Sequence, residues 1–328
     1  MNIFYAIQGT GNGHISRAIQ LYPYLKKHGN VDFFLSGANA QLNYNIPIKY
    51  KSNGVSLFYK HTGGLDYIKI IKSLSFNLYQ EAKALPVEKY DLVINDFEFV
   101  ASLACSLKKK PCIQFGHQAS FQSKKTPRAK TVNPMGNLIL ENFVKSEKYL
   151  GLHFDSYDNN IYNPIIKDEI INAVPINDEH ITVYLPQYSI AHLEPYLLNE
   201  SDIHFEVFTN EVNSIVCKKN ISYHPINNNS FTNSLIRCCG IITAGGFETP
   251  AEAMYMSKKI LSIPIAHHYE QACNATALSK MGITVIDKID KSFSKIFRDW
   301  INNSSAVKLN LKHSTEDIVS LLMKNTLK

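Results

Sequence analysis

The sequence lacks an apolar run of the roughly 18 to 20 residues that a membrane-spanning helix requires. Its longest candidate, residues 99–107, is about half that length. The chain leads from Met1 directly into a strand-like segment at residues 3–7, without the basic and apolar regions of a secretory signal. We therefore expect a cytoplasmic protein without a transmembrane segment, and peripheral contact with the inner membrane face stays open.

Metal-binding spacings of cysteine and histidine are also absent. The six cysteines include no CxxC pair, and the twelve histidines show no HxxxH or HExxH spacing. We expect the cysteines to be reduced packing residues and the chain to hold no structural metal site.

The composition that remains is that of a globular protein. The chain has 328 residues, of which 45% are hydrophobic and 19% are charged, and this length is sufficient for two domains with separate cores. A formal net charge of +6 is a mild basic excess. It favours a small anionic ligand and falls well short of a nucleic-acid-binding composition, so we expect no nucleic-acid partner.

Short apolar runs alternate with amphipathic stretches along the chain, which is typical of βαβ units and mainly parallel sheets. We predict an α/β fold with two Rossmann-like domains that face each other across a cleft. The expected parts are a first domain at 1–155, a linker at 156–180, a second domain at 181–305 and a C-terminal helix within 306–328.

Individual elements follow from the same patterns. Pro23 is expected to kink or shorten the first helix, residues 117–136 to form a loop, and the Asn-rich residues 227–230 a turn. Strands are expected at 3–7, 32–35, 56–59, 91–95, 111–115, 181–185, 204–208, 240–243, 259–263 and 284–286. Helices are expected at 14–28, 66–83, 98–108, 248–257, 269–281 and 314–325.

A glycine loop, GTGNGH at residues 9–14, follows the first strand and opens a helix, where backbone N–H groups can hold a phosphate. It departs from the dinucleotide fingerprint because His14 stands at the third glycine, and the second strand ends without an acidic residue. An NAD or FAD site is therefore disfavoured. The loop either binds a ligand or only permits tight packing of strand and helix. Its candidate binding residues are Gly11, Asn12 and Gly13.

His14 and Asp96 are the candidate catalytic pair. His14 lies where the loop becomes a helix, and Asp96 ends a later strand, so both are expected at one edge of the sheet. A neutral imidazole there can accept a proton from a hydroxyl, and a carboxylate can orient its ring. The alternative makes Asp96 a helix N-cap and His14 a structural residue.

The second half contains a strand, a Gly-Gly turn and a helix start at residues 241–253. The free N–H groups of such a helix start suit a diphosphate, and Glu252 lies one turn further, within reach of a ribose diol. A second strand end at Pro264 leads to Glu270 and Gln271, which suit sugar hydroxyls. The candidate residues at the helix start are Gly245, Gly246, Phe247 and Glu248.

These motifs resemble those of the GT-B glycosyltransferases that use nucleotide-diphosphate sugars, of the UDP-glycosyltransferase and MurG-like type. GTGNGH is similar to the family's glycine loop with its His, and AGGFETPAEA to its helix-start motif with a ribose-binding Glu, here Glu252. IPIAHHYEQACNA is similar to the segment whose acidic-Gln pair contacts the donor sugar. The resemblance covers most of the chain at low similarity. It implies His14 as general base, Asp96 as its partner, and donor contacts from Glu270, Gln271 and the neighbouring Asn274.

The sequence departs from the MurG-like pattern in two places. Lys167, in NPIIK, stands where those enzymes place an Arg that neutralises the diphosphate, and the glycine loop lacks their doubled glycines. A Lys supplies charge without the two-pronged geometry of an Arg, so we assign Lys167 to the donor site on its charge alone. Both departures count against lipid II synthesis.

We therefore predict a hexosyltransferase that moves a sugar from a nucleotide diphosphate to an acceptor hydroxyl with inversion. The family resemblance favours UDP as the nucleotide. We expect no cofactor and no metal, because no DxD pair ends a strand near the diphosphate site and helix N-termini can take the metal's role. The acceptor stays open between a small molecule, a glycan and a lipid. Two other functions also stay open, a nucleotide-sugar epimerase or hydrolase of the same fold and a noncatalytic nucleotide-sugar-binding protein.

Two features near the expected acceptor side are open to several interpretations. Residues 117–130 are basic and contain no Asp or Glu, which suits an anionic acceptor, an anionic membrane surface or a solvated loop. Tyr67, Phe76 and Tyr79 either line an acceptor pocket or belong to the core.

Overall fold

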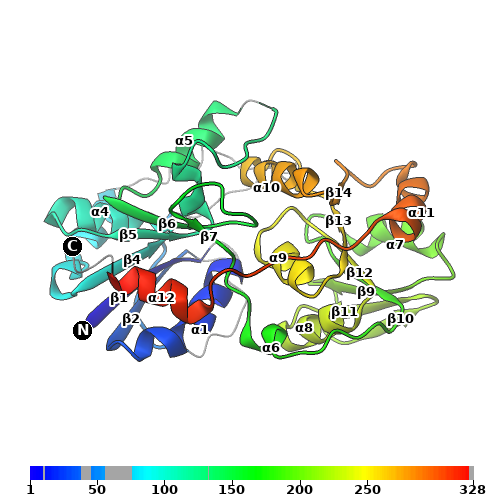
Figure 1. Ribbon diagram of the computed structural model, residues 1–328, viewed down its shortest axis with the longest axis horizontal. Coiled ribbons are helices and arrows are strands. Elements are labelled where there is room, and N and C mark those ends of the chain that lie inside the picture. The colour runs from blue at the N-terminus through cyan, green and yellow to red at the C-terminus, as the bar shows by residue number, and fades with distance from the viewer. Residues whose placement is uncertain (10–11, 38–45, 56–75, 132, 325–328) are drawn as a thin grey trace.

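The computed structural model describes residues 1–9, 12–37, 46–55, 76–131 and 133–324 (Figure 1). The described residues of the first half form a parallel sheet in the order β3-β2-β1-β4-β5-β6-β7. Its strands are β1 (Asn2–Gln8), β2 (Asn30–Ser36), β3 (Ile48–Ser52), β4 (Leu92–Asp96), β5 (Ile113–Gly116), β6 (Lys148–Leu152) and β7 (Ile161–Tyr162).

The second sheet has the order β10-β11-β9-β8-β12-β13-β14 and is parallel apart from the β10–β11 pair. Its strands are β8 (His180–Tyr184), β9 (His204–Thr209), β10 (Val216–Lys218), β11 (Ile221–Pro225), β12 (Gly240–Thr243), β13 (Lys259–Ser262) and β14 (Thr284–Val285). The two sheets lie side by side along the longest axis of the molecule, each with its own helices (Figure 1).

Helices cover the sheets, so the central strands are buried on both faces. Every residue of β4 and of β12 is buried, which explains why apolar residues follow one another at Leu92–Ile94 and Ile241–Ile242 without the alternation of a half-exposed strand. The first half contains α1 (Asn12–Lys26), α3 (Phe76–Ala84), α4 (Phe99–Lys108) and α5 (Pro134–Asn142), with short 3-10 turns η1 (Val87–Lys89) and η2 (Gln118–Gln122). The later helices are α6 (Asp168–Ile171), α7 (Ile190–Leu198), α8 (Asn228–Arg237), α9 (Glu248–Tyr255), α10 (Tyr269–Lys280), α11 (Phe293–Asn303) and α12 (Thr315–Lys324).

The predicted α/β class with two parallel sheets is confirmed, and some local details differ. Helix α1 runs through Pro23 to Lys26, because Pro23 lies in the last turn, where few further backbone bonds are lost. The expected turn at 227–230 is the start of α8, where the Asn227 side chain accepts from the N–H groups of Asn229 and Ser230. The strand expected at 56–59 lies outside the described residues, as does the first part of the helix expected at 66–83.

The chain passes between the two sheets twice. Strand β7, within the segment expected to be a linker, pairs with β6 and so extends the first sheet. After α11 the chain returns across the molecule, and α12 packs on α1 (Figure 1). The buried face of α12, which includes Ile318, Val319 and Leu322, joins the same hydrophobic cluster as the buried face of α1. The C-terminal helix therefore belongs to the first domain in space, although it follows the second in sequence.

Residues 117–131 and 133–136, expected to belong to a loop, contain regular structure at both ends. They begin with the buried turn η2 and end where Asn133 caps α5 by accepting from the Gly136 N–H. Of the cysteines, Cys105, Cys112, Cys238 and Cys273 are buried and free, whereas Cys217 on β10 is exposed, so the expectation that all six pack in the interior is wrong for Cys217.

Within the described part of the chain, no helix is both long and apolar enough to cross a membrane.

Glu98 is a buried carboxyl that caps α4. Its two oxygens accept from the N–H groups of Val100 and Ala101, and its side chain is inaccessible to solvent. Burial raises the pKa of Glu98 to about 7, although these backbone N–H groups oppose the shift.

We expect this group to make the protein less stable as the pH rises. A carboxyl whose pKa is raised in the folded state contributes most stability below its unfolded pKa, and that contribution is lost as the pH rises through about 7. Between pH 5 and pH 8, the free energy of unfolding should fall by up to about 3 kcal/mol more in the wild type than in Glu98→Gln, which has no carboxyl to titrate. Urea unfolding at both pH values measures the difference, and Glu316→Gln, at an exposed position, is the control. An equal pH dependence in the wild type and Glu98→Gln would contradict the prediction.

Candidate functional site

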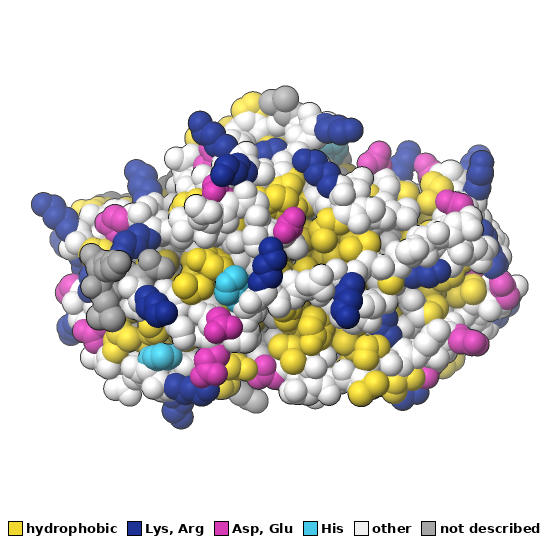
Figure 2. All heavy atoms as spheres, viewed as in Figure 1, with side chains coloured by type: hydrophobic (Ala, Val, Ile, Leu, Met, Phe, Trp, Pro, Cys, Tyr) yellow, Lys and Arg dark blue, Asp and Glu magenta, His cyan; other side chains and the backbone are white. Residues whose placement is uncertain are grey.

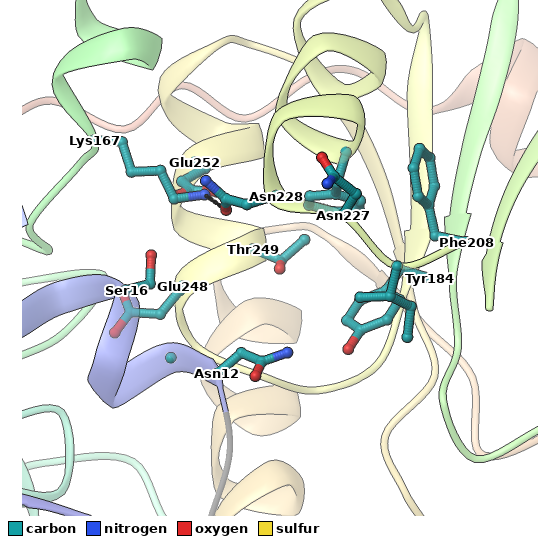
Figure 3. A pocket seen from close by; sticks show the side chains of 13 residues that line it. Asn12, Ser16, Lys167, Tyr184, Phe208, Asn227, Asn228, Glu248, Thr249 and Glu252 are labelled. Atoms are coloured by element: carbon teal, nitrogen blue, oxygen red, sulfur yellow. Dashed lines mark hydrogen bonds and ion pairs between the residues drawn. The ribbon is translucent and has the colours of Figure 1, made fainter. Parts of the chain in front are cut away.

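A pocket lies between the two domains, at the carboxyl ends of their strands (Figure 3). It brings together five of the predicted donor-binding residues: Asn12, Gly13, Lys167, Glu248 and Glu252. Gly11 lies outside the described residues. The pocket also contains residues that the sequence reasoning missed, namely Ser16, Tyr184, Phe208, Ile226, Asn227, Asn228, Phe231 and Thr249.

The starts of two helices meet at this pocket. Gly13, in the first turn of α1, packs against Glu248, the first residue of α9, and a Cβ at Gly13 would lie 3.2 Å from Glu248 Cγ. Each helix start carries a partial positive charge. The two helix starts therefore favour an anionic ligand, although the carboxylates of Glu248 and Glu252 line the same pocket.

His14 and Asp96 are in direct contact, as the sequence predicted. His14 Nδ1 lies 2.7 Å from Asp96 Oδ1. Asp96 is inaccessible to solvent, whereas the His14 side chain is 12% exposed. The N-cap of α4 is Glu98, so the alternative that assigned Asp96 to a cap is wrong.

Arg17 completes this pair and was missed by the sequence reasoning. Its Nε lies 2.9 Å from Asp96 Oδ2 and its Nη2 lies 2.7 Å from Asp96 Oδ1, a two-pronged contact. The Tyr5 hydroxyl donates to the same carboxylate at 3.1 Å. Burial alone would raise the pKa of Asp96, but Arg17 and then His14 lower it to about 2.

The third nitrogen of Arg17 reaches the other domain. Arg17 Nη1 forms an ion pair with Glu248 at the start of α9. Arg17 lies three residues after His14, on the buried face of α1 that also carries Ala18 and Leu21. A charged residue on an otherwise apolar helix face, one turn from a candidate base, was the signal in the sequence.

Gly116 makes room for this cluster. It ends β5 with φ +109°, a conformation that favours glycine. A Cβ at this position would lie 2.8 Å from Asp96 Oδ1 and 2.9 Å from Arg17 Nη2.

At the far side of the pocket, Lys167 pairs with Glu252. Lys167 Nζ lies 3.3 Å from Glu252 Oε1 and 3.2 Å from Asn228 Oδ1. Burial raises the pKa of Glu252, and Lys167 opposes the shift. The positive charge of Lys167 is thus shared with the carboxylate expected to bind ribose, and the lysine does not stand alone as a diphosphate partner.

An aromatic wall closes the opposite end of the pocket. Tyr184 at the end of β8 and Phe208 near the end of β9 lie across from Lys167 and Glu252 (Figure 3). Phe231 of α8 packs against both rings, with centroids 5.5 Å from Tyr184 and 5.2 Å from Phe208. Flat apolar faces of this kind accommodate a planar ring.

Several other predicted donor residues brace the Gly-Gly turn and do not line this pocket. Gln271 Oε1 accepts from the N–H groups of Gly245 and Ile265 at 3.2 and 2.8 Å. The buried Asn274 donates to the Gly245 carbonyl at 3.0 Å. Gly245 is packed tightly, since an added Cβ would lie 2.9 Å from the Gln271 carbonyl, whereas a Cβ at Gly246 would meet nothing within 4 Å.

The same segment holds the two domains together. Phe247 stacks on His117 with centroids 4.0 Å apart and planes 9° apart. His117 Nε2 lies 2.7 Å from Asn274 Oδ1, and Gln118 donates to Glu270 at 3.1 Å. The turn that precedes α9 is therefore held from both domains.

Among the described residues, no group of three or more His, Cys, Asp or Glu side chains is arranged as metal ligands.

We expect Gly116→Ala to be far more destabilising than Gly282→Ala. Both glycines have positive φ, at +109° and +86°, but only Gly116 faces buried charges, while a Cβ at Gly282 would meet nothing within 4 Å. Gly282→Ala should cost about 1 kcal/mol from backbone strain alone. Gly116→Ala should cost about 3 kcal/mol or more, because it also displaces a buried ion pair. Urea unfolding compares the two, and equal losses would show that the cluster tolerates the added methyl group.

Comparison with known proteins identifies the family of the chain. Residues 1–301 match the family model described as glycosyl transferase family 1. Comparison with proteins of curated function gives no match.

Solved glycosyltransferase structures share the fold over nearly the whole chain. Arabidopsis thaliana UGT89C1 complexed with UDP has a TM-score of 0.62 at 11% identity and covers 98% of this chain and 99% of its own. Acinetobacter baumannii MurG has a TM-score of 0.58 at 16% identity, and the match covers 98% of this chain and 99% of MurG. Phytolacca americana UGT2, complexed with UDP-2fluoro-glucose and pterostilbene, has a TM-score of 0.61 at 14% identity. The match covers 98% of this chain and 93% of UGT2. The chain therefore has the GT-B fold and belongs to glycosyl transferase family 1.

Proposed function

We propose that this protein transfers a hexosyl group from a UDP-sugar to an acceptor hydroxyl with inversion, and that His14 is the general base. The observation that carries the proposal is the contact of His14 Nδ1 with Asp96 Oδ1 at 2.7 Å, beside the pocket where α1 and α9 begin. A nucleotide sugar bound in that pocket has its anomeric carbon near His14, which is the partly exposed residue of the His14–Asp96 pair.

The pocket offers a suitable environment for each part of a nucleoside diphosphate. The wall of Tyr184, Phe208 and Phe231 suits a planar base, and Glu252 suits a ribose diol. The starts of α1 and α9 suit the diphosphate, so its charge is met without a metal ion. Two of the solved relatives contain UDP or a UDP-sugar analogue, which supports UDP as the nucleotide.

The reaction then proceeds in one displacement. The acceptor oxygen attacks the anomeric carbon as its proton passes to His14 Nε2, and the bond to the diphosphate oxygen breaks on the opposite face. The resulting imidazolium donates from Nδ1 to Asp96, while the helix starts stabilise the leaving diphosphate. Inversion follows because attack and departure occur on opposite faces.

The acceptor side has one conspicuous surface. Helix α5 lies near the top of the view in Figure 1, and it exposes Met135 and Leu138, which are 38% and 57% accessible. Lys124 and Lys130 are exposed nearby in the sequence, and dark blue side chains gather at the top of the face shown in Figure 2. Apolar side chains among basic ones favour an acceptor carried by a lipid, reached from the cytoplasmic face of a membrane.

We expect His14→Ala to lower turnover by about 10²–10⁴-fold, because that is the usual contribution of a general base. UDP affinity should stay at the wild-type value, since His14 acts on the acceptor. Release of UDP from UDP-hexoses, with candidate acceptors, measures turnover, and His28→Ala, at an exposed position of the same domain, is the control.

The same assay separates the alternatives. Sugar release without an acceptor would identify a hydrolase, and interconversion of the sugar an epimerase. Tight UDP-sugar binding without turnover on any acceptor would identify a binding protein. Full turnover in His14→Ala would exclude this residue as the base.

Glu252→Ala should weaken UDP binding by about 1.5–3 kcal/mol, because the ribose hydroxyls lose their hydrogen bonds to the Glu252 carboxylate. Glu270→Ala is the matched comparison, since Glu270 does not line the pocket of Figure 3. It should leave UDP binding unchanged and weaken UDP-hexose binding. Calorimetry with both ligands tests the pair, and unchanged UDP affinity in Glu252→Ala would remove this residue from the nucleotide site.

A further inference from the structure

Arg17 is a buried cation that bonds acidic groups of both domains. Its side chain is 2% exposed, and its three nitrogens bond Asp96 twice and Glu248 once. Asp96 ends β4 of the first domain, whereas Glu248 begins α9 of the second. One guanidinium therefore connects the partner of the proposed base to the helix proposed to bind the diphosphate.

Arg17 also lies directly against His14. Arg17 Nη2 lies 3.0 Å from His14 Nδ1 and 2.7 Å from Asp96 Oδ1. Asp96 Oδ1 lies 2.7 Å from His14 Nδ1. Guanidinium, carboxylate and imidazole thus form a closed triangle. The negative charge of Asp96 is shared between the other two groups.

The charged and titratable groups around His14 come from four elements. Arg17 lies on the same helix, Asp96 on β4 and Glu248 on α9, and the Tyr5 hydroxyl of β1 donates to Asp96. His117, buried beyond Arg17, adds a further imidazole that interacts with the guanidinium. Among these groups, Arg17 is the only permanent cation.

Removing that cation would change the protonation of His14. An imidazole beside an uncompensated buried carboxylate is stabilised in its protonated form, and a protonated imidazole cannot accept the proton of an acceptor hydroxyl. Arg17 compensates the carboxylate and places a positive charge 3.0 Å from Nδ1, which disfavours a second positive charge on the ring.

We propose that Arg17 is a positioning residue of the transfer reaction: it holds Asp96 in place, opposes a positive charge on the His14 ring and links both to the donor-binding helix through Glu248. The inference rests on the proposed function, in which His14 accepts the proton of the acceptor. Arg17 contacts no reacting atom in this scheme and acts through Asp96 and His14.

The test measures the protonation of His14 directly. In the full-length protein labelled with ¹³C-histidine, the imidazole resonance of His14 is identified by its loss in His14→Gln and followed over pH. In Arg17→Gln, the pH midpoint of His14 protonation should rise by about one unit or more, the usual effect of a charge at this distance. The acid limb of kcat/KM for UDP-hexose should move in the same direction.

Arg128→Gln is the matched control. Arg128 is a half-buried arginine of the same domain that bonds the Phe121 carbonyl at 2.7 Å, and its replacement should leave the His14 midpoint at the wild-type value. If Arg17→Gln fails to fold, Arg17→Lys provides the test, because a lysine cannot make both bonds to Asp96 and the midpoint must still rise by a few tenths of a unit. A wild-type midpoint in the folded Arg17 variants would overturn the proposal.

The inference and the proposed function fail in different ways. An unmoved His14 midpoint in the Arg17 variants, together with an inactive His14→Ala, overturns the role of Arg17 and leaves the proposed function intact. A raised midpoint together with a fully active His14→Ala overturns the proposed function, and with it the role of Arg17 in transfer.

Discussion

The buried ion pairs of Arg17 are the interaction on which the rest of the site depends. Two carboxylates from different domains are held by one guanidinium that is almost inaccessible to solvent. A buried charge is tolerated only when it is paired and hydrogen-bonded, so the relative placement of the domains and the geometry of the His14–Asp96 pair are set by the same group. Gly116 is part of this arrangement, because any side chain there would occupy the space of the ions.

Around that centre, the parallel sheets determine which residues meet. In each domain the loops at the carboxyl ends of the strands lie at one edge, and the domains present these edges to each other. Asn12 and Gly13 from the first domain and Glu248, Thr249 and Glu252 from the second thus line one pocket. The pocket combines two helix starts at one side with an aromatic wall at the other, which is the combination that a nucleoside diphosphate requires.

A second set of contacts keeps the turn before α9 in place. Gln271 and Asn274 bond the backbone of Gly245, and the Phe247 ring stacks on His117 of the other domain. These residues resemble a donor-binding set in sequence, but their polar atoms are largely engaged by the protein itself. Protein contacts therefore hold the turn in place, which would reduce the entropy lost if a diphosphate binds there as proposed.

The sequence by itself determined the elements and the chemistry at their ends. Apolar runs identified most central strands, because strand periodicity is a local property, whereas β3, β6, β7, β10 and β11 were missed. The order of strand ends indicated the proximity of His14 and Asp96, and the GT-B fold followed from the resemblance of the motifs to a known family. Arg17, the partner of Lys167 and the aromatic wall of Tyr184, Phe208 and Phe231 were decided only by the tertiary structure. Each of them depends on a contact between segments far apart in the chain. No local pattern specifies which distant carboxylate pairs with a given cation or which aromatic rings line the same cavity.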